Sequence, residues 1–213
     1  MDKRLPSPMW ALEYEAMDRG YFAVCGCDEA GAGPLAGPVY AAAVILPRDL
    51  ELAYLNDSKQ VTPRRRDLLF DQIRERAVAW AVASVSAEEI DRLDILNARI
   101  QAMQMAIDQL DPCADFALID GNRDHGSRCA IGTDHALVIK GDSRSASIAA
   151  ASILAKVSRD RYMERLAEAY PQYQFDRHKG YGTKLHYALL DTYGPSPVHR
   201  RTFLRRWEEG RHG

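Results

Sequence analysis

Three short apolar runs in this 213-residue chain end in carboxylates that could bind metal ions. Asp28 and Glu29 follow the first run, Asp120 ends the run 116–119, and Asp142 follows the run 136–139. Short apolar runs bounded by turn residues are typical of buried strands, and ligands tend to bind at the strand ends of open α/β sheets. Carboxylates gathered there would repel one another unless cations neutralised them. Because hard divalent cations prefer oxygen ligands, the pattern predicts a divalent-metal site at one edge of a sheet.

Such a site has a definite chemistry. Two metal ions about 3.5–4 Å apart can activate a water and stabilise the leaving oxygen of a phosphodiester. The sequence has no P-loop, Rossmann fingerprint or Ser-His-Asp pattern that would compete with this interpretation. His178, His186 and His199 are alternative acid–base groups, although surface or core positions are the commoner outcome for histidines. The other alternative is that the acids only form turns, which explains one strand end more easily than three.

The acidic pair lies in the stretch 21–46, which is predicted to form a strand, a turn and a second strand. Neighbouring residues of a strand point to opposite faces, so Asp28 and Glu29 reach one site only at a strand end or a bulge. Gly31 and Gly33 follow and let a ligand approach the backbone closely. The alternative interpretation of this stretch is an acidic surface turn.

Further strands and helices follow from periodicity and capping signals. Thr62 and Pro63 form a helix start, and Ser86 with Glu89 has the spacing of a capping box. Strands first and then strands alternating with helices indicate an α/β domain around a mixed sheet. The other predicted elements are strands over 78–85, 116–119 and 136–139, helices over 95–110 and 145–170, and a short helix from Thr183 to about Tyr193.

Composition is ordinary for a globular protein, with 46% apolar and 27% charged residues. No apolar run approaches the roughly 20 residues of a membrane span, and the N-terminus lacks the apolar region of a signal peptide, so we expect a cytoplasmic protein without a membrane partner. The four cysteines then read as reduced thiols. Only Cys25 and Cys27 are close in sequence, so a zinc site is not expected.

Charge is distributed unevenly along the chain. Residues 1–139 hold 14 Lys/Arg and 22 Asp/Glu, whereas residues 140–213 hold 14 and 8. A basic C-terminal third suits an anionic partner, and we expect Arg200, Arg201, Arg205 and Arg206 to contribute affinity for that partner. Solvated helix faces are the alternative.

Five motifs together resemble the ribonuclease HII family, a type 2 ribonuclease H. They are DEAGAGPLAGPV (28–39), LNDSK (55–59), ALIDGN (117–122), KGDSRSASIAAASILAKVSRDR (140–161) and HKGYGTKLH (178–186). The resemblance implies a ribonuclease H-like mixed five-stranded sheet flanked by helices, with a helical C-terminal part. It implies one domain over 1–213, with a catalytic core over about 21–170 and a basic substrate-binding part over about 171–213. The sister family, ribonuclease HIII, has an extra N-terminal domain. The resemblance here begins at about Tyr21, and we expect the 20 residues before it to leave no room for such a domain.

The resemblance also implies an activity. The family hydrolyses the RNA strand of RNA–DNA hybrids and nicks duplex DNA 5′ of single embedded ribonucleotides, leaving 3′-hydroxyl and 5′-phosphate ends. Its four metal-binding and catalytic acids fall on Asp28, Glu29, Asp120 and Asp142, which implies Mn²⁺ or Mg²⁺ as cofactor. We expect the protein to act as a monomer.

Substrate-binding positions also come from the resemblance. The turn Gly31-Ala32-Gly33 corresponds to the family's contact with the ribonucleotide 2′-OH, largely through main-chain groups, and Tyr181 to a tyrosine that stacks on the neighbouring sugar. Lys59 suits a phosphate. The family usually has Arg or Lys where this chain has Ala32. The alternatives are a solvated lysine at position 59 and a loop aromatic packed on the core at position 181.

Two rival functions remain open. A non-catalytic hybrid-binding module should lack one or more of the four acids, and all are present. A metal-dependent enzyme acting on small phosphate esters would have no use for a basic C-terminal third. Ser143 and Arg144 could cap the long helix or contact phosphate.

Overall fold

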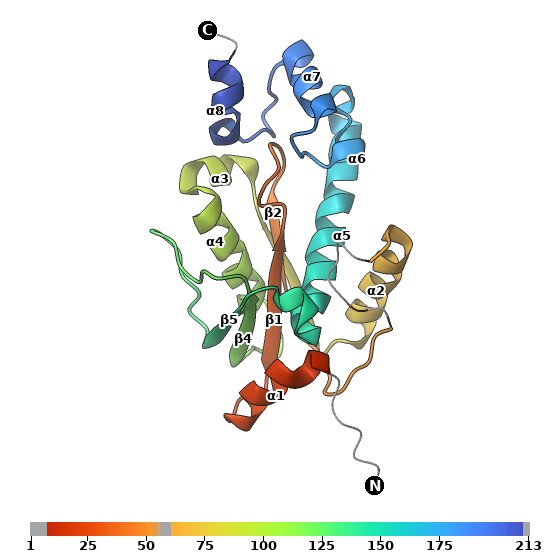
Figure 1. The fold of residues 1–213 in the computed structure, drawn as a ribbon, viewed down its shortest axis with the longest axis vertical. Helices are drawn as coiled ribbons and strands as arrows, with labels where there is room; N and C mark the ends of the chain where they lie inside the picture. Colours follow the sequence, from red (N-terminus) through yellow and green to blue (C-terminus); the bar gives the residue numbers. More distant parts are fainter. Residues whose placement is uncertain (1–7, 54, 56–60, 211–213) are drawn as a thin grey trace.

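The structure, a computed structural model, describes residues 8–53, 55 and 61–210. Its centre is a five-stranded sheet with the order β3-β2-β1-β4-β5 (Figure 1). β1 pairs antiparallel with β2 and parallel with β4, β2 pairs antiparallel with β3, and β4 pairs parallel with β5. The predicted mixed five-stranded sheet is therefore confirmed. The strands are β1 (Val24–Ala30), β2 (Val39–Ile45), β3 (Ala79–Val85), β4 (Phe116–Asp120) and β5 (His135–Val138).

Helices cover both faces of the sheet and one end of it. The α-helices are α1 (Ala11–Asp18), α2 (Pro63–Arg76), α3 (Ala87–Leu93), α4 (Ile95–Asp108), α5 (Ala146–Ala169), α6 (Phe175–His178), α7 (Lys184–Tyr193) and α8 (Arg201–Glu209). Three short 3-10 segments complete the described elements: η1 (Pro8–Trp10), η2 (Gly141–Ser143) and η3 (Pro171–Tyr173). No helix of the described ranges is long and apolar enough to cross a membrane.

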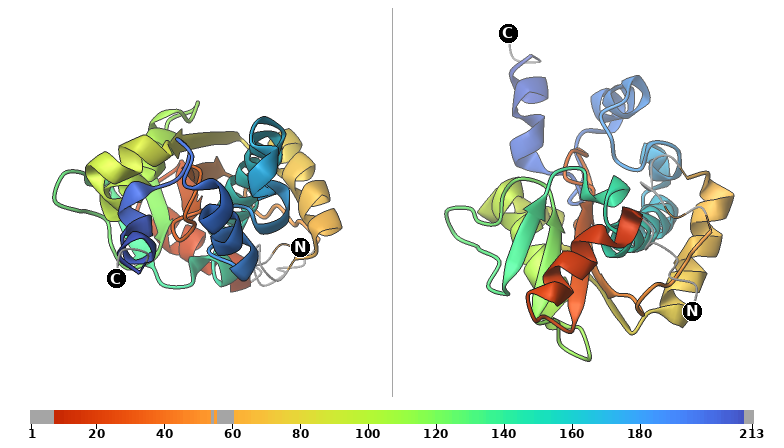
Figure 2. Two further views of the ribbon diagram at one scale, coloured as in Figure 1. Left: turned by 90° about the horizontal axis from the view of Figure 1, so that it is seen from above. Right: turned by 60° about the horizontal axis from the view of Figure 1, so that its bottom comes forward.

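The sheet separates two main apolar clusters because successive strand residues point to opposite faces. Ala41 and Ala43 of β2 pack with α4, whereas Ala42 and Val44 pack with α2 and α5. The predicted packing role of Cys25 and Cys27 is confirmed, since both lie in the α4 cluster. Figure 2 shows the resulting layers from above.

The start of α5 lies directly against β1. A Cβ atom at Gly26 would fall 2.1 Å from backbone atoms of Ser147 and Ile148. Glycine at this position therefore lets the helix approach the strand that carries the acidic pair. The Ser145 side chain accepts a hydrogen bond from Ile148 N and caps α5.

The C-terminal helices pack on the loop that joins β1 to β2. Leu35 and Ala36 of this loop share an apolar cluster with Met163 of α5, Leu190 of α7 and Leu204 of α8. Figure 1 shows α7 and α8 beyond the end of the sheet, next to this loop. The fold thus places the basic C-terminal part beside the segment that follows the acidic pair.

Helix boundaries agree closely with the capping signals. Ser86 accepts a hydrogen bond from Glu89 N, and Thr183 accepts one from His186 N, as predicted. Thr62 occupies the N-cap position of α2, but its side chain makes no capping hydrogen bond. The Glu89 side chain, which the capping-box spacing had pointed to, forms an ion pair with Arg92 of the same helix.

Candidate active site

Asp28 and Glu29 lie in the last part of β1, beyond its pairing with β4. The parallel ladder ends at Cys27 opposite Ile119, whereas the pairing with β2 continues through Asp28 and Glu29. Asp120 follows Ile119 directly, so Asp28 and Asp120 come one residue after the ladder on adjacent strands. The strand register therefore brings two of the three acidic strand ends together.

Asp28 is the most enclosed of these acids, with 6% of its surface exposed. Burial raises its pKa well above the ordinary value, and the negative charges of Glu29 and Asp120 raise it further. Hydrogen bonds from the Ser152 hydroxyl of α5 and from Glu29 N act in the opposite sense. Asp28 thus lies beside two other carboxylates in a buried position, where a negative charge on its own carboxyl group is unfavourable.

Glu29 points toward the other face of the sheet. Its Oε1 lies 3.1 Å from Nη2 of Arg99 on α4, in a half-buried ion pair. The strand alternation expected from the sequence is therefore visible, with Asp28 directed toward α5 and Glu29 toward α4.

Asp142 reaches the same edge through η2. Asp120 Oδ1 accepts a 2.6 Å hydrogen bond from Gly141 N, the residue before Asp142. A Cβ atom at position 141 would lie 2.5 Å from the Ile148 side chain and 3.2 Å from Asp120 Oδ1, so the turn packs tightly there. Asp142 itself is 9% exposed. One hydrogen bond thus fixes the third acidic segment against the end of β4.

The donor set fits hard divalent cations. Burial and then the negative charges of Glu29 and Asp120 raise the pKa of Asp28, and a bound cation would offset this cost of the charged carboxylate. In the arrangement shown, Glu29 is paired with Arg99, and Asp120 is hydrogen-bonded to Gly141. Within the described ranges, no group of three or more His, Cys, Asp or Glu side chains is already spaced to hold a metal ion.

Two buried arginines hold the loop 31–38 that follows the acidic pair. Arg200 donates to the carbonyl oxygens of Gly31 at 2.7 Å and Ala32 at 2.9 Å. Arg159 of α5 donates to Pro38 O and Ala36 O. Gly31 has φ +91°, and a Cβ atom there would lie 2.0 Å from Arg159 Nε, so only glycine suits this position. Gly33 is exposed, and no atom lies within 4 Å of a Cβ built there.

Tyr181 lies at the same end of the molecule. The Arg159 guanidinium stands over its ring at 5.7 Å, and 43% of the residue is exposed. Leu35 N donates to Gly180 O at 2.8 Å, which ties the tyrosine's loop to the loop 31–38. The structure therefore brings the GAG turn and Tyr181 together around Arg159, with the ring accessible. Lys59 lies outside the described residues.

The alternative acid–base role for the three histidines is wrong. His178, His186 and His199 are buried and hydrogen-bonded within the C-terminal helical part. Burial lowers the pKa of each, to about 4 for His186 and about 3 for His199. These rings are therefore neutral structural groups.

Three other expectations are refined by the structure. Arg200 cannot contribute to a surface for phosphates, because it is fully buried on loop carbonyls. Ser145 caps α5, while Ser143 Oγ donates to Lys140 O. Arg144 contacts Ile139 O and lines a separate cavity.

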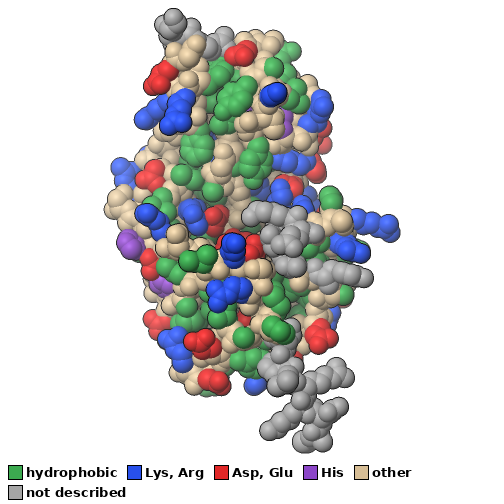
Figure 3. Space-filling model, in the orientation of Figure 1, with side chains coloured by type: hydrophobic (Ala, Val, Ile, Leu, Met, Phe, Trp, Pro, Cys, Tyr) green, Lys and Arg blue, Asp and Glu red, His purple; other side chains and the backbone are tan. Residues whose placement is uncertain are grey.

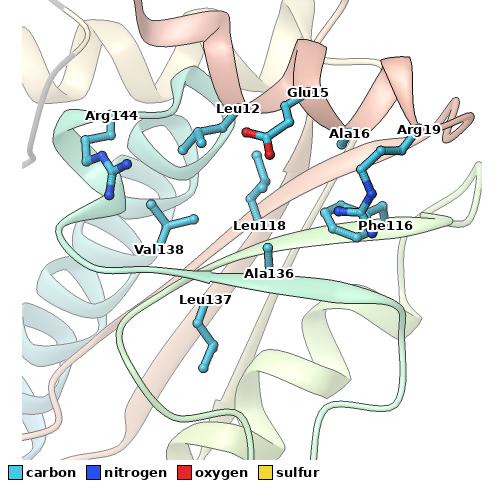
Figure 4. A pocket seen from close by; sticks show the side chains of 10 residues that line it. All are labelled: Leu12, Glu15, Ala16, Arg19, Phe116, Leu118, Ala136, Leu137, Val138 and Arg144. Carbon is cyan, nitrogen blue, oxygen red and sulfur yellow. The ribbon is translucent and has the colours of Figure 1, made fainter.

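That cavity, of about 160 Å³, lies between α1 and the strands β4 and β5. Figure 4 shows its apolar floor and Arg19 beside the ring of Phe116. None of its lining residues is one of the four predicted metal-binding acids, and Arg144 is its one residue that the sequence offered as a phosphate contact. The lining residues are Leu12, Glu15, Ala16, Arg19, Phe116, Leu118, Ala136, Leu137, Val138 and Arg144.

Sequence reasoning missed Arg99, Arg159 and Arg200 as residues that organise the site. Arg159 carried a usable signal, because it stands four residues from Ala155 and from Met163, on a buried stripe of α5. Arg200 is followed by the exposed Arg201, and nothing local distinguishes the two.

The surface seen in Figure 3 carries Asp and Glu side chains near its centre, with Lys and Arg side chains close beside them. On such a surface the carboxylates can bind metal ions, and the Lys and Arg side chains can bind a polyanion.

Comparison with known proteins supports the same class. A sequence model of the family Ribonuclease HII matches residues 25–207. Ribonuclease HII of Dechloromonas aromatica is 55% identical over 181 residues, 84% of this chain and 90% of that protein. Ribonuclease HII of Shouchella clausii is 50% identical over 201 residues, 94% of this chain and 76% of that protein. The crystal structure of ribonuclease H2 from Pyrococcus horikoshii superposes with a TM-score of 0.72 at 26% identity, covering 89% of this chain and 98% of that one.

The fold is that of the ribonuclease H-like enzymes, a mixed five-stranded sheet flanked by helices. The chain belongs to the ribonuclease HII family, whose members are metal-dependent nucleases acting on RNA–DNA substrates. A structure of a ribonuclease HIII in complex with Mn²⁺ shares the fold, with a TM-score of 0.58 at 20% identity.

Proposed function

We propose that this protein hydrolyses the RNA strand of RNA–DNA hybrids and nicks duplex DNA on the 5′ side of a single embedded ribonucleotide. The products are 3′-hydroxyl and 5′-phosphate ends. The observation that carries the proposal is the buried Asp28 beside Glu29 and Asp120, with its pKa raised by burial and by their charges. Membership of the ribonuclease HII family supports the substrate class.

The four acids Asp28, Glu29, Asp120 and Asp142 are proposed to hold two divalent cations, Mn²⁺ or Mg²⁺. Bound there, the cations would supply an activated water and charge stabilisation for the leaving 3′-oxygen. Attack by water leaves the 2′-OH free to be recognised, and this hydroxyl is what marks RNA against DNA at the cleaved position. A two-metal mechanism and ribonucleotide recognition therefore suit each other.

Recognition of the ribonucleotide is assigned to two neighbouring loops. Main-chain groups of Gly31, Ala32 and Gly33 contact the 2′-OH, and the exposed ring of Tyr181 stacks on the adjacent sugar. Support comes from the proximity of the two loops, which Arg159 contacts together. Lys59 is proposed to bind a phosphate.

The whole chain is proposed to act as one unit. Residues of about 21–170 form the catalytic core, and residues of about 171–213 form the basic substrate-binding part. The packing of Leu204 and Leu190 against Leu35 supports this division, since it holds the C-terminal helices beside the loop 31–38. We propose that the protein acts as a monomer in the cytoplasm.

The test uses two end-labelled DNA duplexes that differ in a single 2′-OH. With Mn²⁺ or Mg²⁺, we expect one nick 5′ of the ribonucleotide, no cut in the all-deoxy duplex and no cut in the presence of EDTA. Cleavage of both duplexes at similar rates would contradict ribonucleotide recognition. Cleavage that continues in EDTA would contradict the metal assignment.

A further inference from the structure

Two consecutive residues, His199 and Arg200, connect the two loops to which ribonucleotide recognition is assigned. We call residues 31–38 the glycine loop and residues 179–183 the tyrosine loop. His199 forms an antiparallel bridge with Ala36, and Arg200 N donates to Leu35 O at 2.8 Å. The segment before α8 therefore runs alongside the glycine loop, consistent with the arrangement in Figure 1.

The Arg200 side chain spans the glycine loop from one limb to the other. Its Nη2 and Nη1 donate to Gly31 O and Ala32 O, and its Nε donates to Gly37 O at 2.9 Å. The side chain is fully buried, and its three donating nitrogens all contact main-chain carbonyls of this loop. A rigid planar fork with several donors holds such a geometry, which a single ammonium group cannot reproduce.

The His199 ring begins a hydrogen-bond chain that ends on the tyrosine loop. Its Nδ1 accepts from Ser196 N at 3.0 Å and from Ser196 Oγ at 2.8 Å. Its Nε2 must then carry the hydrogen and donate to His186 Nε2 at 3.0 Å. The Nδ1–H of His186 in turn donates to Tyr181 O at 3.0 Å.

Each atom in this series of hydrogen bonds can be assigned as a donor or an acceptor without conflict. A carbonyl oxygen accepts only, so Tyr181 O fixes the tautomer of His186, and His186 Nε2 fixes that of His199. On the neighbouring ring, His178 Nδ1 accepts from Gly180 N at 3.2 Å, and its Nε2 donates to Tyr173 O. His178 stacks on His186 with ring centroids 4.3 Å apart. The tyrosine loop is thus held at Gly180 N and Tyr181 O by buried neutral rings.

We propose that His199 and Arg200 are positioning residues that fix the tyrosine loop and the glycine loop relative to each other for reading the ribonucleotide. The inference rests on the proposed role of these loops. Neither side chain contacts substrate; Arg200 acts through Gly31 and Ala32, and His199 acts through His186 and the main chain of Tyr181. Misplacement of positioned groups by about 1 Å can lower rates by about 100-fold, so both residues act on the chemical step.

The experiment compares single-turnover cleavage of the one-ribonucleotide duplex with duplex binding measured in Ca²⁺-free EDTA buffer. His199→Leu removes the donor to His186, whereas His199→Gln keeps an N–H near the position of Nε2. Arg200→Lys keeps the charge but cannot reach three carbonyls. His125→Leu and Arg92→Lys are matched controls, because both side chains are exposed and far along the chain from either loop.

We expect His199→Leu and Arg200→Lys to lower the single-turnover rate by about tenfold or more while duplex affinity changes less than about twofold. His199→Gln should recover most of the rate, and both controls should cut at the wild-type rate. Circular dichroism melts identify any variant that fails to fold. If His199→Leu does not fold, Arg200→Lys and His199→Gln still decide the question.

The proposal is overturned if folded His199→Leu or Arg200→Lys cuts at the wild-type rate. It is also overturned if the loss appears entirely in duplex affinity, or if a folded His199→Gln is as slow as His199→Leu. Failure of the proposed function looks different, because the wild-type protein itself would then not cut the one-ribonucleotide duplex.

Discussion

The carboxylate of Glu29 lies 3.1 Å from the guanidinium of Arg99, on the face of the sheet opposite the one that Asp28 faces. The positive charge of this α4 arginine thus partly neutralises the carboxylates that are proposed to bind a divalent cation. Arg99 and a bound cation would each stabilise the negative charge of the Glu29 carboxylate. Because both are positive, they would also repel each other, so Arg99 should weaken cation binding. We therefore expect the pair to influence how tightly the proposed site binds a cation.

Replacing Arg99 with Met should strengthen metal binding. Loss of one neighbouring positive charge changes the interaction energy by about 1 kcal/mol, so the Mn²⁺ concentration for half-maximal cleavage should fall about fivefold. The free energy of unfolding measured in EDTA should fall as well, because Glu29 then lacks this partner. Arg92→Met is the control, since its ion pair with Glu89 is at the surface. An unchanged Mn²⁺ titration would show that Arg99 does not influence the metal site.

Asp120→Asn should abolish cleavage and leave hybrid binding largely intact. The amide Oδ1 can still accept from Gly141 N, so the turn at η2 should persist. Thermal stability in EDTA should rise, because one carboxylate leaves a cluster whose members repel one another. Asp142→Asn should lose cleavage in the same way, and full activity in that variant would contradict its assignment as a ligand.

Arg201, Arg205 and Arg206 are exposed on α8 and remain candidates for phosphate contacts. Replacing all three with Gln should flatten the dependence of log K on log salt by about 0.9 for each arginine that contacts a phosphate. Duplex affinity measured at several salt concentrations gives the slope. An identical slope in the triple variant would mean that these charges are only solvated.

Titration of His186 and His199 should lower the stability of the protein as pH decreases from about 6.5 toward 4. Burial lowers the pKa of His186 to about 4 and of His199 to about 3, whereas in the unfolded chain both titrate near the ordinary value of 6.5. Above that pH both residues are neutral in both states, and they add no pH dependence. Below it the unfolded chain binds protons that the folded chain does not, so each histidine lowers the free energy of unfolding by about 1.4 kcal/mol per pH unit.

Urea unfolding at pH 7, 6 and 5 checks this linkage. His186→Asn should reduce the slope of unfolding free energy against pH by the contribution of one bound proton, about 1.4 kcal/mol per pH unit. Equal slopes in wild type and His186→Asn would contradict the linkage.

Strands and helices were predictable wherever local pattern decides structure. The hairpin around Asp28 and Glu29, the caps at Ser86 and Thr183, and the long helix α5 all follow from periodicity and capping. Strand alternation also predicted that the acidic pair faces both sides of the sheet. Each of these features depends on residues only a few positions apart.

The organising arginines were not predictable because their partners are remote in sequence. Arg159 binds the carbonyl of Pro38 and Arg200 that of Gly31, across more than a hundred residues in each case. Arg200 and Arg201 look alike in sequence, yet only Arg200 is buried. Helix packing decides which charge turns inward, and the local pattern does not contain that information.

By the resemblance to the family, Ala32 corresponds to a position where Arg or Lys is usual, so this chain can test what that side chain contributes. Its carbonyl accepts from Arg200, which holds the peptide independently of the side chain. A main-chain hydrogen bond contributes about 0.5–1.5 kcal/mol, and a buried partner left unpaired costs roughly 1–3 kcal/mol. With the proposed main-chain contact to the 2′-OH, those energies would favour RNA at the cleaved position whether or not residue 32 is charged.

Ala32→Arg should therefore tighten binding of all duplexes, most strongly at low salt, without changing which phosphodiester is cut. A cation added near phosphates acts through charge, which does not distinguish ribose from deoxyribose. Cleavage and binding are measured on two duplexes that differ in one 2′-OH, for the Ala32 protein and the variant. The backbone-recognition argument is wrong if the Ala32 protein cuts both duplexes at similar rates, or if only Ala32→Arg distinguishes them.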